Sequence, residues 1–199
     1  EFAIQSYVES FYKKGDKIRI GVGRAGNVIG GGDWAPNRII PDCIRSWSKN
    51  QSAILRNPNS TRPWQHVLEP LSGYLTLAKS LNKSNELHGE AFNFGPNSNN
   101  EFSVKDLVYE MQKHWNNAKW IYKKNKNSNS EAGLLKLNCD KALSLLKWKA
   151  NWNFEKTIYE TISWYDYYLN NRDNLHDFSL SQIENYLVDL KKNTQNDIS

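Results

Sequence analysis

Hydrophobic and polar residues alternate along this chain with two periods, one typical of helices and one typical of short strands. Apolar residues in segment 1–14 recur at roughly helical spacing, and Gly15 follows where a helix would stop. Residues 17–24 instead alternate β-branched apolar side chains with polar or small ones. This alternation predicts a strand that delivers Arg24 to its carboxyl end.

The same two periods continue through the rest of the chain. A 3-4 apolar spacing predicts helices over residues 38–49, 69–81, 103–111, 140–146 and 154–165, with a weaker helix or tail over 175–192. Short strands are predicted over residues 53–56, 63–68, 90–94, 120–122 and 134–137. Ser103 and Asp140 are expected to cap their helices, and the polar run 123–130 is expected to be a mobile loop.

Helices thus alternate with short strands, which favours α/β layers over a helix bundle or a β-sandwich. Several strands are too short to form a sheet of their own. We therefore expect the C-terminal part of a doubly wound parallel (Rossmann-type) sheet, plus a smaller α/β domain at its carboxyl edge, where such sheets hold ligands. The expected divisions are residues 1–35 with a strand near 90–96, residues 36–172, and a C-terminal helix or tail over 173–199.

Charge and cysteine content exclude several classes of function. The 199 residues carry a net charge of +5, and Lys and Arg are scattered among acidic residues, so nucleic-acid binding is not required. Cys43 and Cys139 form no CxxC pair and no His cluster accompanies them, so neither a metal site nor a disulfide framework is indicated. No apolar run approaches the roughly 20 residues of a membrane span. We expect a cytoplasmic protein without a membrane partner.

Polar side chains that suit anion binding stand where predicted strands end. Asn27 follows the strand 17–24, and the glycines at 30–32 would let backbone N–H groups approach a phosphate closely. Arg38 lies in the first turn of a predicted helix, where exposed N–H groups attract anions. Each residue also has an ordinary explanation as a turn-forming Asn, a flexible glycine turn or a solvated Arg.

Two further arginines and a second Asn extend this set. The forked guanidinium of Arg62 could hold a diphosphate at two points, although a surface Arg beside a proline explains it too. Arg56 could border a base pocket or lie on an edge strand without a ligand, and Asn93 repeats the strand-terminal position of Asn27. His66 lies within a short predicted strand and is interpreted as a hydrogen-bonded structural histidine rather than a catalytic one.

Specific wording in the chain carries a family resemblance. The runs are RAGNVIGGGDW (24–34), NRIIP (37–41), ILRNP (54–58), RPWQHVLEPLSGY (62–74) and NFGP (93–96). Together they resemble the C-terminal half of the extended short-chain dehydrogenases/reductases that act on nucleotide sugars, and within that family the CDP-glucose 4,6-dehydratases. The closing helices also match, with Lys147 where a glycine is usual.

The resemblance implies roles for the matching positions. Residues 1–35 would end the dinucleotide-binding domain, and residues 36–172 would mainly form the nucleotide-sugar-binding domain. Substrate-binding roles are implied for Asn27, Arg38, Ile39, Arg62, Asn93 and Glu131. The backbone of Ala25 and Gly26 would pass close to the nicotinamide of NAD.

The resemblance also implies a hydro-lyase chemistry. Family enzymes keep NAD bound, oxidise the hexose at C4, eliminate water across C5 and C6, and return the hydride to C6. CDP-glucose would become CDP-4-keto-6-deoxyglucose, in deoxysugar and O-antigen (lipopolysaccharide) biosynthesis. The Tyr-x-x-x-Lys pair and the glycine-rich NAD motif are expected upstream of residue 1, because the chain starts mid-helix without Met. We therefore assign no catalytic residue here and expect this fragment alone to be inactive.

Other readings stay open. The substrate could be another nucleoside diphosphate sugar, with dehydration or epimerisation as the outcome, or the chain could be a non-catalytic nucleotide-sugar-binding module. An RNA-binding role would require a basic stripe with interleaved aromatics, which this sequence lacks. The helix 1–14 is expected to help pair full-length subunits into a homodimer, although burial within one subunit explains its apolar residues equally well.

Overall fold

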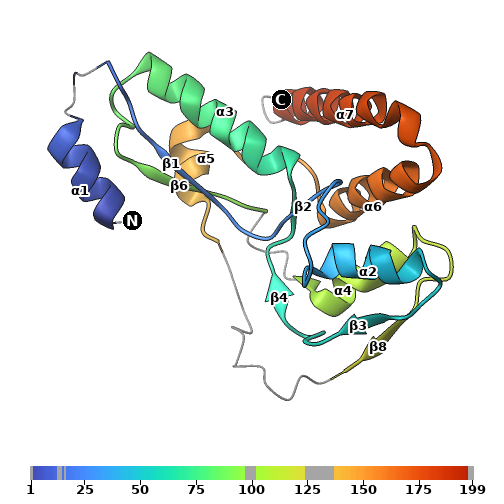
Figure 1. The fold of residues 1–199 in the computed structure, drawn as a ribbon. Coiled ribbons are helices and arrows are strands. Elements are labelled where there is room, and N and C mark those ends of the chain that lie inside the picture. The colour runs from blue at the N-terminus through green and yellow to red at the C-terminus, as the bar shows by residue number, and fades with distance from the viewer. Residues whose placement is uncertain (1, 13–14, 16, 97–101, 124–136, 197–199) are drawn as a thin grey trace.

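Short parallel strands flanked by helices make up the computed structural model, which describes residues 2–12, 15, 17–96, 102–123 and 137–196 (Figure 1). The predicted α/β class is confirmed. Residues 124–136 lie outside the described residues, and with them Glu131, the predicted loop and most of the predicted strand over 134–137.

Within the described residues the strands form four two-stranded sheets, where the sequence predicted part of one larger doubly wound sheet. Three pairs are parallel: β1 (Val22–Ala25) with β6 (Ala91–Phe94), β2 (Val28–Ile29) with β5 (Gln65–His66), and β3 (Ala53–Leu55) with β8 (Trp120–Tyr122). One pair is antiparallel, β4 (Thr61–Arg62) with β7 (Phe102–Ser103). Ala25 pairs with Phe94, so β1 and β6 end at the same edge.

The predicted strand over 17–24 is shorter in the structure. Only its end belongs to β1, because Ile20, before Val22, is bonded to His88 and Gly89, which precede β6, and not to a strand. The N–H of Gly89 donates to the carbonyl of Ile20, and the N–H of Ile20 donates to Nδ1 of His88. Polar contacts therefore fix this entry segment where alternation alone predicted a continuous strand.

Helices account for most of the remaining described chain. They are α1 (Phe2–Phe11), α2 (Ile39–Trp47), α3 (Leu68–Lys83), α4 (Val104–Gln112), α5 (Asp140–Leu146), α6 (Phe154–Asn170), the 3₁₀ turn η1 (Arg172–Asn174) and α7 (Leu175–Asn196). The Ser103 cap is confirmed, since Ser103 and Asp106 form a reciprocal capping box on α4. The Asp140 cap is wrong: Asp140 is the first helical residue, and its N–H donates to Oδ1 of Asn138.

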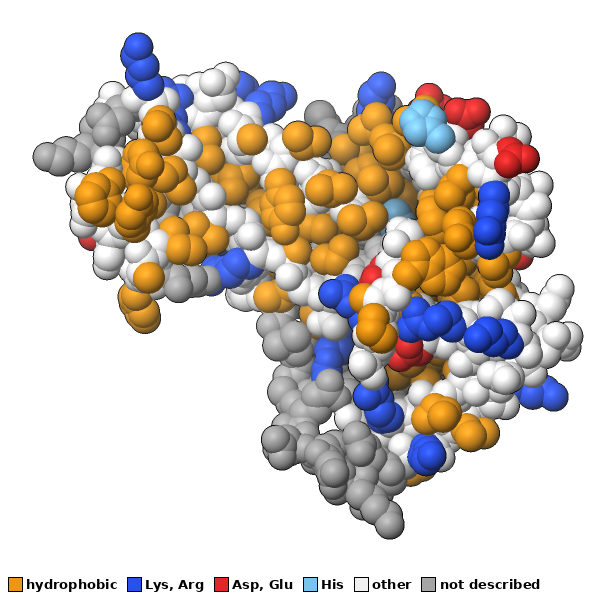
Figure 2. All heavy atoms as spheres, in the orientation of Figure 1, with side chains coloured by type: hydrophobic (Ala, Val, Ile, Leu, Met, Phe, Trp, Pro, Cys, Tyr) orange, Lys and Arg blue, Asp and Glu red, His pale blue; other side chains and the backbone are white. Residues whose placement is uncertain are grey.

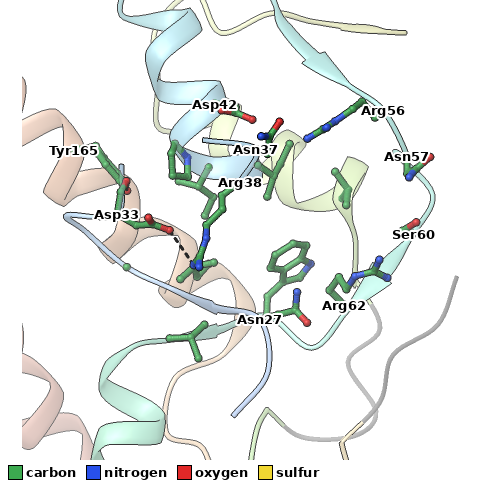
Figure 3. Close-up of a pocket in the computed structure, with 18 of the residues that line it drawn as sticks. Asn27, Asp33, Asn37, Arg38, Asp42, Arg56, Asn57, Ser60, Arg62 and Tyr165 are labelled. Atoms are coloured by element: carbon green, nitrogen blue, oxygen red, sulfur yellow. Dashed lines mark hydrogen bonds and ion pairs between the residues drawn. The ribbon is translucent and has the colours of Figure 1, made fainter. Parts of the chain in front are cut away.

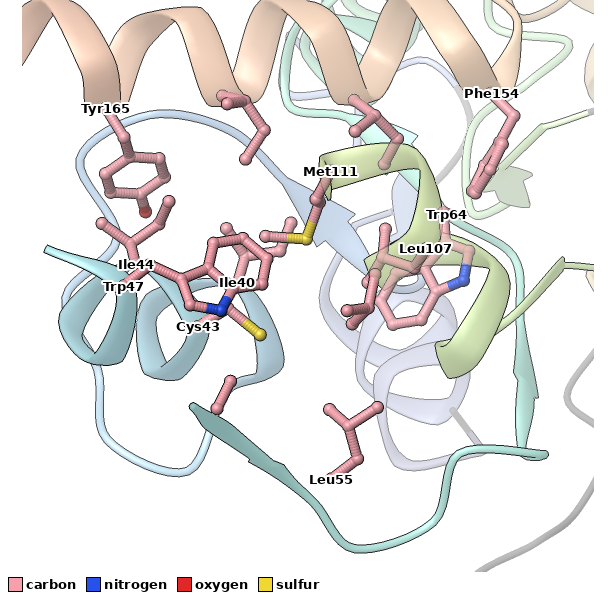
Figure 4. Packing of buried hydrophobic residues seen from close by; sticks show 14 residues of the cluster. Ile40, Cys43, Ile44, Trp47, Leu55, Trp64, Leu107, Met111, Phe154 and Tyr165 are labelled. Atoms are coloured by element: carbon pink, nitrogen blue, oxygen red, sulfur yellow. The ribbon is translucent and has the colours of Figure 1, made fainter. Parts of the chain in front are cut away.

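Two hydrophobic clusters hold these elements together. The larger one is built from α2, β3, α4 and α6 around Trp64 (Figure 4). The smaller one joins α3, β6 and α5, where the Trp148 ring meets Phe94 edge to face at 4.9 Å. Both faces of the short β1–β6 ribbon therefore have helices nearby, as expected for a layered α/β fold.

A buried carboxylate fastens α7 to the rest of the molecule. Glu69 is fully buried and accepts hydrogen bonds from the N–H groups of Trp152 (2.7 Å) and Asn151 (2.9 Å) and from the Tyr186 hydroxyl (2.8 Å). Burial raises the pKa of Glu69, and these three donors oppose that rise. The weak helix predicted over 175–192 is instead a long helix, because long-range polar contacts reinforce its modest apolar pattern.

Candidate functional site

A cavity of about 770 Å³ opens where the end of β1, the start of α2 and the segment β3 to β4 meet (Figure 3). Five of the residues predicted to bind substrate line it, together with Ala25: they are Asn27, Arg38, Ile39, Arg56 and Arg62. Their positions span 36 sequence positions and come from four different elements or loops. The fold therefore brings most of the predicted set to one hollow.

Asn27 stands at the turn that leaves β1. Its φ of 49° lies in the left-handed region, which Asn tolerates better than other non-glycine residues. Its carbonyl accepts a bond from the N–H of Gln65 at 3.3 Å. The turn is thus anchored to β5, and the residue reaches the cavity wall.

Arg38 enters the cavity from the residue before α2 and meets a carboxylate there. Its Nη1 lies 3.2 Å from Oδ2 of Asp33, the contact drawn as a dashed line in Figure 3. Oδ1 of Asp33 accepts from the N–H of Ala35 (2.9 Å), and its carbonyl accepts from the Tyr165 hydroxyl (2.6 Å). Because Asp33 is held at three atoms, it is the fixed partner of the longer arginine side chain.

The charges lining the cavity favour an anion. Among the described lining residues are three arginines, Arg38, Arg56 and Arg62, and two aspartates. One aspartate, Asp42, is already paired with Arg45, which lies outside the lining. Nη1 of Arg62 donates to the carbonyl of Thr61 at 2.7 Å, which orients its guanidinium at the end of β4. A ligand with two negative charges complements this wall better than a neutral one.

The triple glycine at 30–32 packs closely against neighbouring side chains. A Cβ on Gly31 would lie 2.0 Å from the Trp164 ring, and one on Gly30 would lie 2.8 Å from the Val67 side chain. Gly32 has a φ of +83°, in the left-handed region. Gly31 is therefore required for close packing on α6 and Gly32 for the turn, while Gly30 packs against Val67 and lines the cavity.

Other predicted residues lie apart from the cavity or at its margin. The Asn93 side chain donates to the carbonyl of Asn138 at 2.8 Å and does not line the cavity. Asn93 thus does not share this cavity with Asn27 and Arg62. Ala25 lines the cavity. At Gly26 the Leu137 side chain fills the neighbouring space, since a Cβ added to Gly26 would lie 3.1 Å from it.

His66 is buried and lies outside the described lining. Its Nδ1 accepts from the N–H of Leu68 at 3.3 Å, and its ring meets the Trp152 ring at 5.0 Å. Desolvation lowers the pKa of His66 to about 4, so the ring is neutral near pH 7. These contacts support the structural interpretation of this histidine.

Asp33, Asn57, Ser60 and Tyr165 also line the cavity, and residue-by-residue reasoning missed them; Asn37, beside Arg38 in the NRIIP run, lines it as well. Tyr165 reaches Asp33 across 132 positions of sequence, so no local pattern announces the contact. Burial raises the pKa of Tyr165 well above its usual range, so its hydroxyl remains a donor. The sequence does carry a signal at Asn37, because Asn favours left-handed turns. Its φ of 65° in the structure lies in that region.

Two searches confined to the described residues bear on metal and membrane roles. No group of three or more His, Cys, Asp or Glu side chains within that part of the chain could hold a metal ion. Within the same part, no helix combines the length and apolar character needed to cross a bilayer.

Sequence comparison finds a curated protein that is similar to most of this chain. The CDP-glucose 4,6-dehydratase of Salmonella typhimurium is 41% identical over 180 residues, which cover 88% of this chain and 50% of that protein. The chain therefore spans about half the length of this curated relative. No protein-family model matches the chain.

Structure comparison finds proteins that share the fold of this chain over about half of their length. UDP-glucuronic acid 4-epimerase from Bacillus cereus, in complex with UDP-glucuronic acid and NAD, matches 83% of this chain and 49% of its own at a TM-score of 0.68 and 17% identity. dTDP-glucose 4,6-dehydratase from Bacillus anthracis, in complex with NAD, matches 89% of this chain and 51% of its own chain, with a TM-score of 0.63 and 19% identity. The fold is thus that of the Rossmann-type epimerases and dehydratases, matched over about half their length.

Proposed function

We propose, from the premise that this chain is related in sequence to CDP-glucose 4,6-dehydratase and shares the fold of the nucleotide-sugar epimerases and dehydratases, that its cavity binds the diphosphate of a nucleotide sugar. The observation that carries the proposal is the shared cavity of Asn27, Arg38 and Arg62. Distant segments supply these three side chains, and all three can donate hydrogen bonds to phosphate oxygens.

The diphosphate is assigned to the part of the cavity wall that Asn27 and Arg62 contribute (Figure 3). Arg38 and Ile39 would border both the nucleotide and the phosphates, and Arg56 would lie beside the base. Asp33 keeps Arg38 over the cavity through Nη1 and leaves the other guanidinium donors for the ligand. The roles of Asn93 and Glu131 in substrate binding stay predictions.

The described lining is suited to binding rather than to proton transfer. It contains no His, Cys, Lys or Glu, and both of its aspartates are paired with arginines. The Tyr165 hydroxyl is committed to the carbonyl of Asp33. We therefore assign this chain the substrate-binding part of the reaction, and we expect it to be inactive alone.

The proposed reaction of the whole protein converts CDP-glucose to CDP-4-keto-6-deoxyglucose in the cytoplasm, for lipopolysaccharide synthesis. NAD, when bound, supplies a reversible hydride acceptor for such a reaction. Of the two residues predicted to approach it, Ala25 fits because it reaches the cavity, whereas Leu137 covers the side of Gly26 where a Cβ would project. A dehydratase or epimerase acting on another nucleoside diphosphate sugar is the alternative, since the matched epimerase structure holds a UDP-sugar.

A homodimer of the whole protein is part of the proposal. α1 exposes Phe2, Tyr7 and Phe11, and apolar side chains gather over this helix in Figure 2. Val8 on the same helix is buried, so α1 has one face toward this chain and another that a second subunit could cover.

Replacing Arg62 tests the proposed site. We expect Arg62→Ala to weaken CDP binding to the 199-residue chain by about 2–5 kcal/mol, because one charged partner of the diphosphate is lost. Isothermal titration calorimetry measures this difference. Arg172→Ala is the matched control, since Arg172 lies on the Tyr168 ring and not in the described lining.

Equal CDP affinity of the Arg62→Ala variant and the unaltered chain would contradict the proposal. Parallel titrations with UDP, dTDP and GDP decide the base. A preference for CDP supports the CDP-glucose assignment, and a preference for another nucleotide moves the substrate to that sugar while leaving the diphosphate site intact.

A further inference from the structure

Gln65 is a buried amide beside the candidate site. The residue is 1% exposed, lies in β5 and does not appear in the described lining of the cavity. Its Nε2 donates to the carbonyl of Phe94 at 2.8 Å and to the carbonyl of Gly26 at 3.1 Å. Its backbone N–H donates to the carbonyl of Asn27 at 3.3 Å. Gln65 thus donates hydrogen bonds to the consecutive carbonyls of Gly26 and Asn27 in this turn.

These bonds lie where β1 and β6 end. Phe94 ends β6 and pairs with Ala25, the last residue of β1, so the Gln65 amide spans the carboxyl ends of two parallel strands. Directly after this point the chain turns through the left-handed Asn27 and joins β5 as β2. The amide therefore sets the place where the chain leaves one sheet and enters another.

Only the nitrogen end of the Gln65 amide is matched by a hydrogen-bond partner. The Oε1 atom of Gln65 is buried and has no hydrogen-bond partner among the described residues. A buried acceptor without a donor is destabilising, whereas the Nε2 group stabilises the fold by supplying donors to the carbonyls of Gly26 and Phe94. Residues that break a local rule in this way tend to occur where function requires them.

We propose that Gln65 is a positioning residue, which fixes the Gly26-Asn27 turn so that the Asn27 amide meets the diphosphate. The inference rests on the proposed function, because it needs Asn27 to be a ligand of the phosphates. Gln65 itself touches no substrate in this account, and it acts through Asn27.

The test compares two glutamines in matched surroundings. Gln182 in α7 is also buried, and its Nε2 also donates two bonds, to the carbonyl of Glu160 (2.7 Å) and to its Oε2 (2.8 Å). Gln65→Met and Gln182→Met remove the same donors and keep the length of the side chain. We expect both variants to unfold at lower urea concentration. We expect Gln65→Met alone to weaken CDP binding, by about tenfold or more, with Gln182→Met within about twofold of the unaltered chain.

Asn27→Ala separates the inference from the proposed function. If Gln65 acts through Asn27, the double variant Asn27→Ala with Gln65→Met binds CDP no more weakly than Asn27→Ala alone. Unchanged CDP affinity in Asn27→Ala contradicts the proposed site. A loss in Asn27→Ala without any loss in Gln65→Met overturns the inference about Gln65 and leaves the proposed site standing.

A measurement on the unaltered chain covers the case in which Gln65→Met does not fold. The side-chain amide protons of Gln65 are expected to shift in NMR spectra when CDP is added, because the turn they hold tightens on the ligand. Those of Gln182 are expected to stay in place. Unmoved Gln65 amide signals at saturating CDP would overturn the inference.

Discussion

His66 shows how a residue with catalytic chemistry is suppressed by its surroundings. The ring is buried and packed against Trp152, and Nδ1 accepts a backbone hydrogen bond. A protonated ring would lose that acceptor and would carry an unpaired charge in an apolar site. Because His66 is buried, it takes no part in the cavity. For the same reason its protonation at low pH is expected to destabilise the whole fold.

The pH dependence of stability follows from this lowered pKa. Between pH 6.5 and about 4 the unfolded chain binds a proton at His66 and the folded chain does not, so stability falls as the pH falls. Above pH 6.5 the contribution is fully present. The whole difference amounts to roughly 3 kcal/mol.

Urea unfolding at pH 7 and pH 4.5 checks this expectation in a matched pair of variants. In His66→Gln the loss of stability on acidification should be smaller than in the unaltered chain, because the titrating ring is gone. His176→Gln, at an exposed histidine of α7, should leave the loss unchanged. Identical pH profiles for the unaltered chain and His66→Gln would show that His66 titrates normally.

Single residues were predictable where their chemistry is local. The strand-end position of Asn27 and the fixed charge of Arg62 are visible in the sequence, and both side chains reach the cavity. Asp33 and Gln65 were not singled out, because their importance comes from contacts with Tyr165 and Phe94 across distant sequence. Sequence patterns report a residue's own turn or strand and carry no information about such partners.

At the level of secondary structure, the end of α5 explains an unusual lysine. Lys147 follows the helix with a φ of 53° and a ψ of 29°, the left-handed conformation that glycine adopts without strain. The N–H of Trp148 bonds back to the carbonyl of Ala142, which closes the helix end. Lysine stands here where the resembling family usually has glycine, and the left-handed backbone supplies the physical reason for that glycine.

Replacing this lysine should stabilise the protein. We expect Lys147→Gly to raise the free energy of unfolding by about 1 kcal/mol, because the left-handed backbone costs an L-residue roughly that much. Ser144→Gly, at an exposed position inside α5, is the control and should lower it by about 0.5 kcal/mol. Urea titrations give both values. A loss of stability in Lys147→Gly would contradict the cap geometry.

Element prediction succeeded where apolar periodicity was strong. The helices over α2, α4 and α6 bury one side in the larger cluster, so their 3-4 spacing is visible in the sequence. The two-residue strands β4 and β7 were missed, because a pair of residues is too short to show alternation. α7 was underestimated because it is held partly by Tyr186 on Glu69, a contact that hydrophobic spacing does not encode.

At the scale of the whole molecule, the cavity lies beside the larger hydrophobic cluster, which supports its wall. Ile40 in α2 and Trp64 after β4 belong to both the cluster and the lining, so the wall that carries Arg38 and Arg62 is fixed by core packing. The predicted division at residue 35 stays a prediction. In the structure the smaller cluster joins α3, β6 and α5 beside β1, so segments from both expected units pack together.

The length relation completes this picture. The chain covers about half of its Salmonella relative and about half of the matched epimerase and dehydratase structures. Its described part provides a cavity lined by cations and amides, with no His, Cys, Lys or Glu in that lining. The substrate-binding role proposed above is consistent with the sequence relation, the fold and these charges.

A crystal structure of the 199-residue chain with CDP tests the central claim most directly. The account predicts density for the diphosphate in the 770 Å³ cavity, with phosphate oxygens about 3 Å from the Arg62 guanidinium and the Asn27 amide. Density for the diphosphate elsewhere on the molecule, or in the cavity with Arg62 and Asn27 both turned away from it, would contradict the account.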